Sequence, residues 1–109
     1  MAKHEFGIMP QSPQKGIRYD KYEPQKYHCI SVNDDDLENI VTQFDDIDFF
    51  WHTPDVPQKG IDYCGITLIP PTSIPAFLSV IQNRHGLSQR ESLLQNALRK
   101  GKWVIHYGL

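Results

Sequence analysis

The spacing of apolar and polar positions divides the chain into successive elements. Strand-forming residues run from Tyr27 to Val32 and predict a β-strand over residues 27–32. Apolar residues then recur at the i, i+3, i+4 and i+7 positions of an amphipathic helix over residues 33–46, and the aspartates at the start of this stretch favour a helix N-terminus. Residues 27–46 therefore predict a strand followed by a helix.

A hairpin is predicted next. Residues 47–53 and 61–69 are both rich in strand-forming side chains. The segment between them, PDVPQKG, has the proline and glycine content of a turn. We expect the two strands to pair with each other.

Two helices and a last strand complete the pattern. After the Pro-Pro break at residues 70–71, apolar positions return to helical spacing until Gly86. Residues 88–100 open with the capping-box pattern S-x-x-E and end with basic residues before a glycine, which predicts another helix. Residues 102–107 predict a strand.

The order of these elements, β-α-β-β-α-α-β, predicts an α+β fold. It resembles the ferredoxin-like (split βαβ) arrangement, or a closely related four-stranded mixed sheet with helices on one face and one extra helix. Right-handed crossovers would place the first and third strands side by side and parallel. A different mixed sheet remains an alternative.

The N-terminal region differs from the rest of the chain. Residues 1–26 are polar, rich in proline and without helical or strand periodicity, so they predict an extended arm. Residues 27–109 then form a single α+β domain. PQKGIRY at 13–19 nearly recurs as PQKGIDY at 57–63; each copy fits a turn that leads into a strand, with a partial duplication as the alternative.

Composition limits the class of protein. A chain of 109 residues with 39% hydrophobic content fits one globular domain. No apolar run approaches the roughly 18 residues of a membrane span, and the N-terminus lacks the apolar core of a signal peptide. Two cysteines without close spacing predict reduced thiols. We expect a cytoplasmic protein with no membrane contact.

Alternation along the predicted strands suggests a candidate site. In the predicted sheet His28, His52, Cys64 and His106 share one face and one end. These residue types suit a zinc site with all four as ligands. They also suit thiol catalysis, with Cys64 as the nucleophile and His28 as its base. The alternative is that Cys64 only fills the core.

The other predicted face is aromatic. Trp51, Tyr63, Trp103 and Tyr107 would form an apolar patch that must be covered by the N-terminal arm, a second subunit or a ligand. The patch favours a homodimer or another protein partner. Nucleic acid is not expected, because the first three predicted strands hold no Lys or Arg and the acidic helix would repel phosphate.

Charges segregate along the chain. Residues 27–58 contain eight acidic side chains and no Lys or Arg, whereas residues 82–109 contain five Lys or Arg and a single acidic residue. An acidic surface over residues 34–48 could dock a basic partner, as acidic inhibitor proteins do. The candidate partner-binding residues are Asp34, Asp35, Asp36 and Glu38.

Function is predicted only in outline. Phosphate-binding glycine loops, GxSxG, HExxH and dinucleotide fingerprints are absent from the sequence. The sequence favours a small binding domain that acts through self-association or a protein partner. The alternatives are a small enzyme or zinc-binding protein that uses Cys64 and the histidines, and an acidic inhibitor-like protein.

Overall fold

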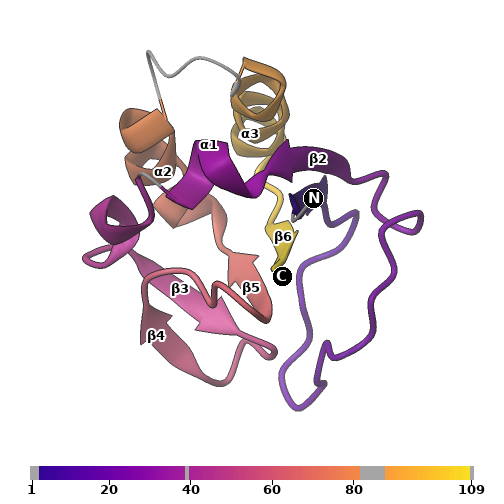
Figure 1. The fold of residues 1–109 in the computed structure, drawn as a ribbon. Coiled ribbons are helices and arrows are strands. Elements are labelled where there is room, and N and C mark those ends of the chain that lie inside the picture. The colour runs from indigo at the N-terminus through magenta and orange to yellow at the C-terminus, as the bar shows by residue number, and fades with distance from the viewer. Residues whose placement is uncertain (1–2, 39, 82–87, 109) are drawn as a thin grey trace.

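A six-stranded antiparallel sheet organises the chain (Figure 1). The structure is a computed structural model that describes residues 3–38, 40–81 and 88–108. The spatial order of the strands is β2-β1-β6-β5-β3-β4. Their bounds are β1 (Lys3–Ile8), β2 (Ile30–Asn33), β3 (Asp48–Trp51), β4 (Pro57–Lys59), β5 (Ile66–Ile69) and β6 (Val104–Tyr107).

The ferredoxin-like prediction is wrong, although the general α+β class holds. The chain forms one six-stranded antiparallel sheet instead of a four-stranded mixed one. The difference begins at β1, which lies in the segment predicted to be an extended arm. This strand pairs with β2 through Lys3↔Asn33 and with β6 through Glu5↔Tyr107, so it is an interior strand of the sheet.

The helices lie over one face of the sheet (Figure 1). They are α1 (Asp34–Glu38), α2 (Ile74–Ile81) and α3 (Ser88–Lys100), with 3-10 turns η1 (Val41–Phe44) and η2 (Pro71–Ser73). The core beneath them is built around Phe77, whose ring stacks on Phe44 at 4.4 Å and meets Phe6 edge-on at 5.9 Å. Aromatic pairs of this geometry add to the free energy gained from burying their area.

The single helix predicted over residues 33–46 is divided. The chain leaves the α1 conformation and turns at Ile40, whose N–H donates to the carbonyl of Leu37 at 3.0 Å. Leu37, Ile40 and Phe44 are nevertheless buried. The apolar spacing therefore identified the buried residues correctly, although the backbone buries them with a short helix and a 3-10 turn.

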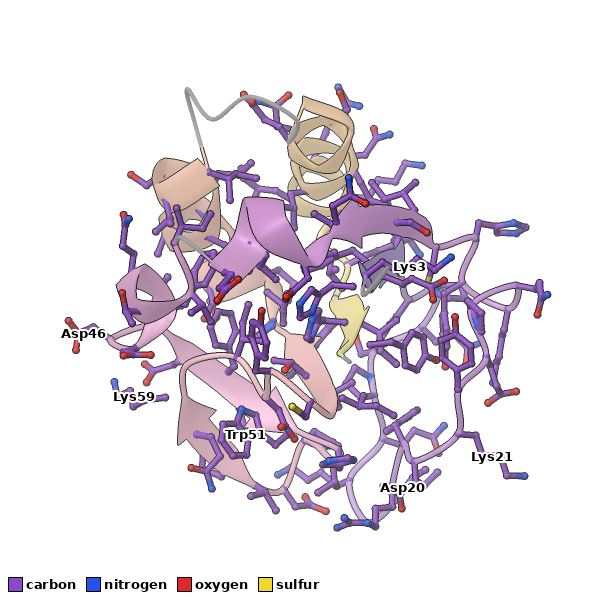
Figure 2. All side chains as sticks on the ribbon, viewed as in Figure 1. Lys3, Asp20, Lys21, Asp46, Trp51 and Lys59 are labelled. Carbon is purple, nitrogen blue, oxygen red and sulfur yellow. The ribbon has the colours of Figure 1, made fainter. Side chains whose placement is uncertain are left out.

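The opposite face of the sheet is covered by the loop of residues 9–29. Met9 and Tyr27 are buried there against Ile105 and Tyr107, and Tyr19 packs beside them. The loop is also fixed by backbone hydrogen bonds, including Tyr19 N–H to the His52 carbonyl at 2.6 Å. In Figure 2, Asp20 and Lys21 mark the position of this loop, on the opposite side of the molecule from Asp46 and Lys59.

The four aromatic residues predicted to form one patch are divided between the two faces. Ile66↔Tyr107 and Trp51↔Thr67 are paired positions, so Tyr107 lies with Ile66 on the loop-covered face while Trp51 lies with Thr67 on the other. Tyr107 is buried, and Trp51, Tyr63 and Trp103 are half-buried. Of the three covers expected for the aromatic patch, the N-terminal segment is the one that lies over the face holding Tyr107.

The interior position of β1 is tested by shortening Phe6. Phe6 is fully buried, and we expect Phe6→Ala to lower the free energy of unfolding by about 3–5 kcal/mol because it leaves a cavity in the core. Leu98→Ala, at a side chain that is 38% exposed, is the control and should cost less than about 1 kcal/mol. Urea unfolding measures both. A Phe6→Ala cost as small as that of Leu98→Ala would mean that residues 3–8 are an arm.

Candidate functional site

Antiparallel pairing gathers polar residues from several strands at one end of the sheet. The start of β1, the start of β5 and the ends of β3 and β6 meet there. We call this region the histidine end, and its residues are His4, Asp34, His52, Asp62, Tyr63, Cys64, Thr67 and His106. Only His52, Cys64 and His106 belong to the predicted cluster.

A pair of buried histidines forms the centre of this region. His4 of β1 and His106 of β6 are both fully buried, and His4 Nδ1 lies 2.9 Å from His106 Nε2. Their rings are nearly parallel, with centroids 5.1 Å apart. Two polar rings inside a core are costly unless each nitrogen has a partner.

The partners fix the direction of the hydrogen bonds. His4 Nε2 lies 3.0 Å from Asp34 Oδ1, which also accepts from the Tyr63 hydroxyl. A carboxylate only accepts, so His4 Nε2 carries the proton and, in a neutral ring, Nδ1 accepts from His106 Nε2–H.

The second ring nitrogen of His106 also has a hydrogen-bond partner. In the neutral ring His106 Nδ1 is an acceptor, and it lies 3.3 Å from the Thr67 hydroxyl. Thr67 Oγ1 in turn accepts the backbone N–H of Asp62 at 2.8 Å. With both imidazoles neutral, the Asp62 N–H donates to Thr67, Thr67 to His106, His106 to His4 and His4 to Asp34. This series of hydrogen bonds joins the 62–65 turn to the first residue of α1.

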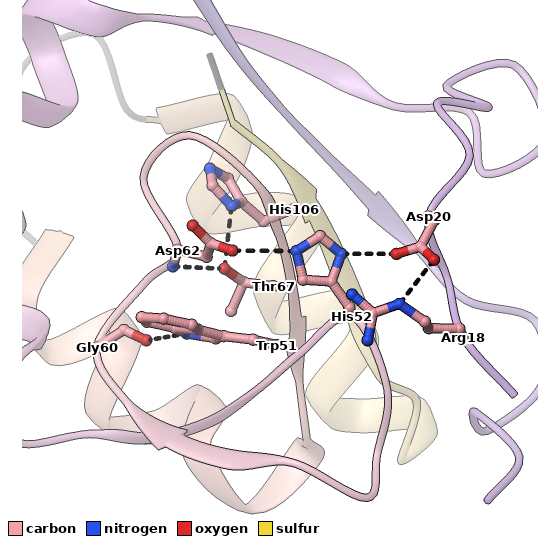
Figure 3. Close-up of polar contacts among 8 residues, drawn as sticks. All are labelled: Arg18, Asp20, Trp51, His52, Gly60, Asp62, Thr67 and His106. Atoms are coloured by element: carbon pink, nitrogen blue, oxygen red, sulfur yellow. Dashed lines mark hydrogen bonds and ion pairs between the residues drawn. The ribbon is translucent and has the colours of Figure 1, made fainter. Parts of the chain in front are cut away.

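His52 forms a second polar group nearer the surface (Figure 3). It follows β3 with a left-handed backbone, φ +64°, which is uncommon for a residue other than glycine. Its Nε2 is 3.2 Å from Asp62 Oδ2, and its Nδ1 is 3.0 Å from Asp20 Oδ1. The Asp20 contact is an ion pair by distance but lacks the alignment of a hydrogen bond. Carboxylates at both nitrogens fit the doubly protonated ring.

Cys64 is exposed on the turn that precedes β5. The Gly65 N–H donates to the Asp62 carbonyl at 3.1 Å and closes this turn. A Cβ at Gly65 would lie 2.2 Å from Asp62 Oδ2, so only glycine lets that carboxylate lie where it meets His52. Cys64 and His52 line the same open hollow of about 450 Å³, with Ile66 and Tyr107 as its apolar wall. This volume is within the range of small-molecule sites.

His28 lies at the opposite end of the sheet. Three successive antiparallel pairings separate β2 from β5, so these strands run in opposite directions, whereas the predicted sheet had them parallel. The four predicted zinc ligands therefore do not meet. Among the described residues, no group of three or more His, Cys, Asp or Glu side chains could hold a metal ion.

The predicted acidic docking residues are only partly on the surface. Asp34 turns inward to His4 and Tyr63, and its side chain is 20% exposed. Glu38 is exposed. The side chains of Asp35 and Asp36 lie outside those that the structure describes. Asp34 is therefore part of the histidine end as well as the start of an acidic segment.

Sequence reasoning missed His4, Asp62 and Thr67. A signal for His4 was present, because His4, Phe6 and Ile8 alternate with polar or small residues as strand residues do. No spacing in the sequence indicates that Thr67 meets His106, since that contact depends on the register of β5 against β6.

The two cysteines differ in environment. Cys29 is half-buried at the end of the loop of residues 9–29, and its burial raises the pKa of the thiol to about 12, with the Glu5 carboxylate adding to the shift. Cys64 is exposed to solvent. Cys29 is therefore protonated at neutral pH and serves as an internal reference for the reactivity of Cys64.

Comparisons with known proteins give no relative from which a function could be transferred. No protein-family model matches the chain, and no curated protein or solved structure matches it. In the part of the chain that the structure describes, no helix has both the length and the apolar character needed to cross a membrane.

The buried histidine pair is tested by removing one ring. We expect His106→Asn to lower the free energy of unfolding by about 2–3 kcal/mol, because the shorter side chain leaves His4 Nδ1 without its donor inside the core. The matched control is His28→Asn at an exposed position, which should change stability by less than about 0.5 kcal/mol. Equal effects in urea unfolding would contradict a buried, hydrogen-bonded pair.

Proposed function

We propose that the chain is a small thiol-dependent enzyme, with Cys64 as the nucleophile and His52 as its acid–base partner. The observation that supports this most is that Cys64 and His52 line one hollow, where Asp62 holds the imidazole. A neighbouring imidazolium stabilises a thiolate and makes it a better nucleophile. His52 replaces His28, which lies too far away to serve as the base of Cys64.

Asp20 keeps His52 in a resting arrangement. Its carboxylate meets His52 Nδ1, the nitrogen that Asp62 leaves available, and also pairs with Arg18 at 2.7 Å. Asp20 is 48% exposed and belongs to the loop, whereas Asp62 is held by the turn before β5. A substrate that enters the hollow can displace Asp20, which lets Nδ1 turn toward the thiolate.

The chemistry requires an electrophilic carbonyl carbon in the substrate. The Cys64 thiolate attacks that carbon and forms a thioester, while the His52 imidazolium gives its proton to the leaving group. Water then cleaves the thioester: the neutral imidazole takes a proton from the water, the hydroxide adds to the acyl carbon, the acid is released, and the thiolate and imidazolium are restored. The apolar wall formed by Ile66 and Tyr107 favours a substrate with an apolar portion beside the carbonyl.

A cytoplasmic location belongs to this proposal. A nucleophilic thiol must stay reduced, and the cytoplasm keeps thiols reduced. Cys64, exposed to solvent, would be prone to oxidation in a secreted protein.

Alkylation of Cys64 by iodoacetamide tests the pairing of thiol and imidazole. At pH 7 we expect His52→Gln to slow the reaction of Cys64 by roughly threefold or more, because the cation that favours the thiolate is lost. Asp20→Asn should accelerate it, because His52 is released. Peptide mass spectrometry measures both cysteines, and Cys29 should remain unmodified even at pH 8, where roughly one thiol in ten thousand is ionised at a pKa of about 12.

The double variant separates a specific effect from simple removal of a charge. If Asp20 acts through His52, most of the acceleration caused by Asp20→Asn should disappear in the His52→Gln background. Equal Cys64 rates in the wild type and both single variants would show an ordinary exposed thiol and end the proposal.

A protein-binding role is the second candidate, and the exposed carboxylates of Glu38, Asp45, Asp46 and Asp48 favour it. Lys59 pairs with Asp48 at 2.5 Å, and Figure 2 shows Lys59 and Asp46 on the same margin of the molecule. Such a surface accelerates association with a basic protein. A second copy of the chain is one such partner, because Lys26, Lys100 and Lys102 line a different part of its surface.

Sedimentation equilibrium tests self-association through this surface. We expect dimers at low salt that dissociate above about 0.5 M salt, where charges are screened within a few ångströms. Replacing Asp45 and Asp46 by asparagine should have the same effect as salt, and Lys21→Gln on the far side should have none. A monomer at all salt concentrations would exclude the homodimer.

A further inference from the structure

A basic hollow lies at the end of the sheet opposite the histidine end. It has a volume of about 350 Å³, and the end of β1, the loop of residues 9–29 and the end of α3 form its walls. Its cationic side chains are Lys26, Lys100 and Lys102, with His28 beside them. Of the described residues that line it, none is a carboxylate.

Two of the three lysines are held in place. Lys102 Nζ donates to the carbonyl of Pro10 at 2.7 Å, which draws the loop toward the start of β6. Lys26 Nζ lies over the ring of Tyr27 at 5.5 Å, in a cation–π contact. Neither contact neutralises the charge. An anion in the hollow therefore meets ammonium groups whose positions are already restricted, which lowers the entropic cost of binding.

The hollow also has an apolar floor. Ile8 and Leu93 line it and are only half-buried, although both pack against the core under the helices. Tyr27 adds a buried aromatic ring to the same wall. A ligand with only a charged group would leave this floor in contact with water.

The backbone at His28 is unusual in the same place. His28 has φ +52°, a left-handed conformation, and its N–H donates to the carbonyl of Gln25 at 3.3 Å. This turn directs the exposed imidazole to the hollow that the three lysines line. Left-handed residues other than glycine are concentrated at functional sites.

We propose that this hollow binds a phosphate monoester that carries an apolar group. The phosphate would lie among Lys26, Lys100 and Lys102, and its apolar group would rest on Ile8, Leu93 and Tyr27. A phosphate monoester carries close to two negative charges at neutral pH and matches several cations better than a single carboxylate does. This site is independent of the thiol chemistry proposed at the other end of the sheet, because the two hollows share no residue.

Isothermal titration calorimetry with phenyl phosphate tests the proposal. We expect phenyl phosphate to bind roughly tenfold more tightly than inorganic phosphate, because its ring buries apolar area on the floor. Phenol, which has the ring without the charge, should show no measurable binding.

Variants place the binding in this hollow. Lys26→Gln and Lys100→Gln are both at exposed positions, and each should weaken phenyl phosphate binding by roughly threefold to fivefold. Lys59→Gln on β4 is the matched control and should leave binding unchanged. Thermal melting should show that all three variants remain folded.

Three results would overturn the proposal. Equal affinity for phenyl phosphate and inorganic phosphate would show that the floor takes no part. Unchanged affinity in Lys26→Gln and Lys100→Gln would place the ligand elsewhere, and a complete lack of phenyl phosphate binding would show that the hollow does not accept this class of ligand.

Discussion

The insertion of β1 between β2 and β6 is the constraint on which the rest of the structure depends. It supplies Phe6 to the core under the helices and His4 to the buried pair with His106. It also makes β2 run opposite to β5, whereas the predicted sheet had them parallel. With β1 between β2 and β6, three antiparallel pairings separate β2 from β5. That reversal brings Asp34 to the histidine end and leaves His28 in the basic hollow.

The polar groups of the histidine end connect parts of the chain that are distant in sequence. His4 and His106 are separated by 102 positions, yet their hydrogen bond links the first strand to the last. Thr67 and the Asp62 N–H extend that link into the turn that carries Cys64, and the Asp62 side chain extends it to His52. Each of the four ring nitrogens of His4 and His106 has a hydrogen-bond partner, and such a pairing specifies one arrangement of these strands, since any slip in register would leave polar atoms unpaired. The exposed Cys64 thiol and the half-buried His52 imidazole are thus attached to a hydrogen-bonded base.

Sequence patterns predicted the local elements better than their arrangement. The strands at 27–32, 47–53 and 102–107 and the helix at 88–100 correspond to β2, β3, β6 and α3 within about three residues, because strand-forming residues or a capping pattern marked each of them. The strand at 61–69 was predicted too long, since β5 begins at Ile66 and residues 62–65 form a turn. The topology was wrong because His4, Phe6 and Ile8 were not read as a strand among polar neighbours. Without β1, the remaining strands fitted a familiar four-stranded pattern. The grouping of faces also failed, since Ile66 pairs with Tyr107 and not with His106, and a shift by one residue exchanges the two faces. No sequence pattern contains that register.

The most direct test is a long-range ¹H–¹⁵N correlation spectrum of the histidine rings at pH 7, with measurement of scalar coupling across the N–H···N bond. The structure predicts a proton on Nε2 and none on Nδ1 in both His4 and His106, with coupling between His106 Nε2 and His4 Nδ1. Rings that exchange rapidly between tautomers, without such coupling, would show that the pair is not assembled. In that case β1 could not occupy the interior position from which the rest of the structure follows.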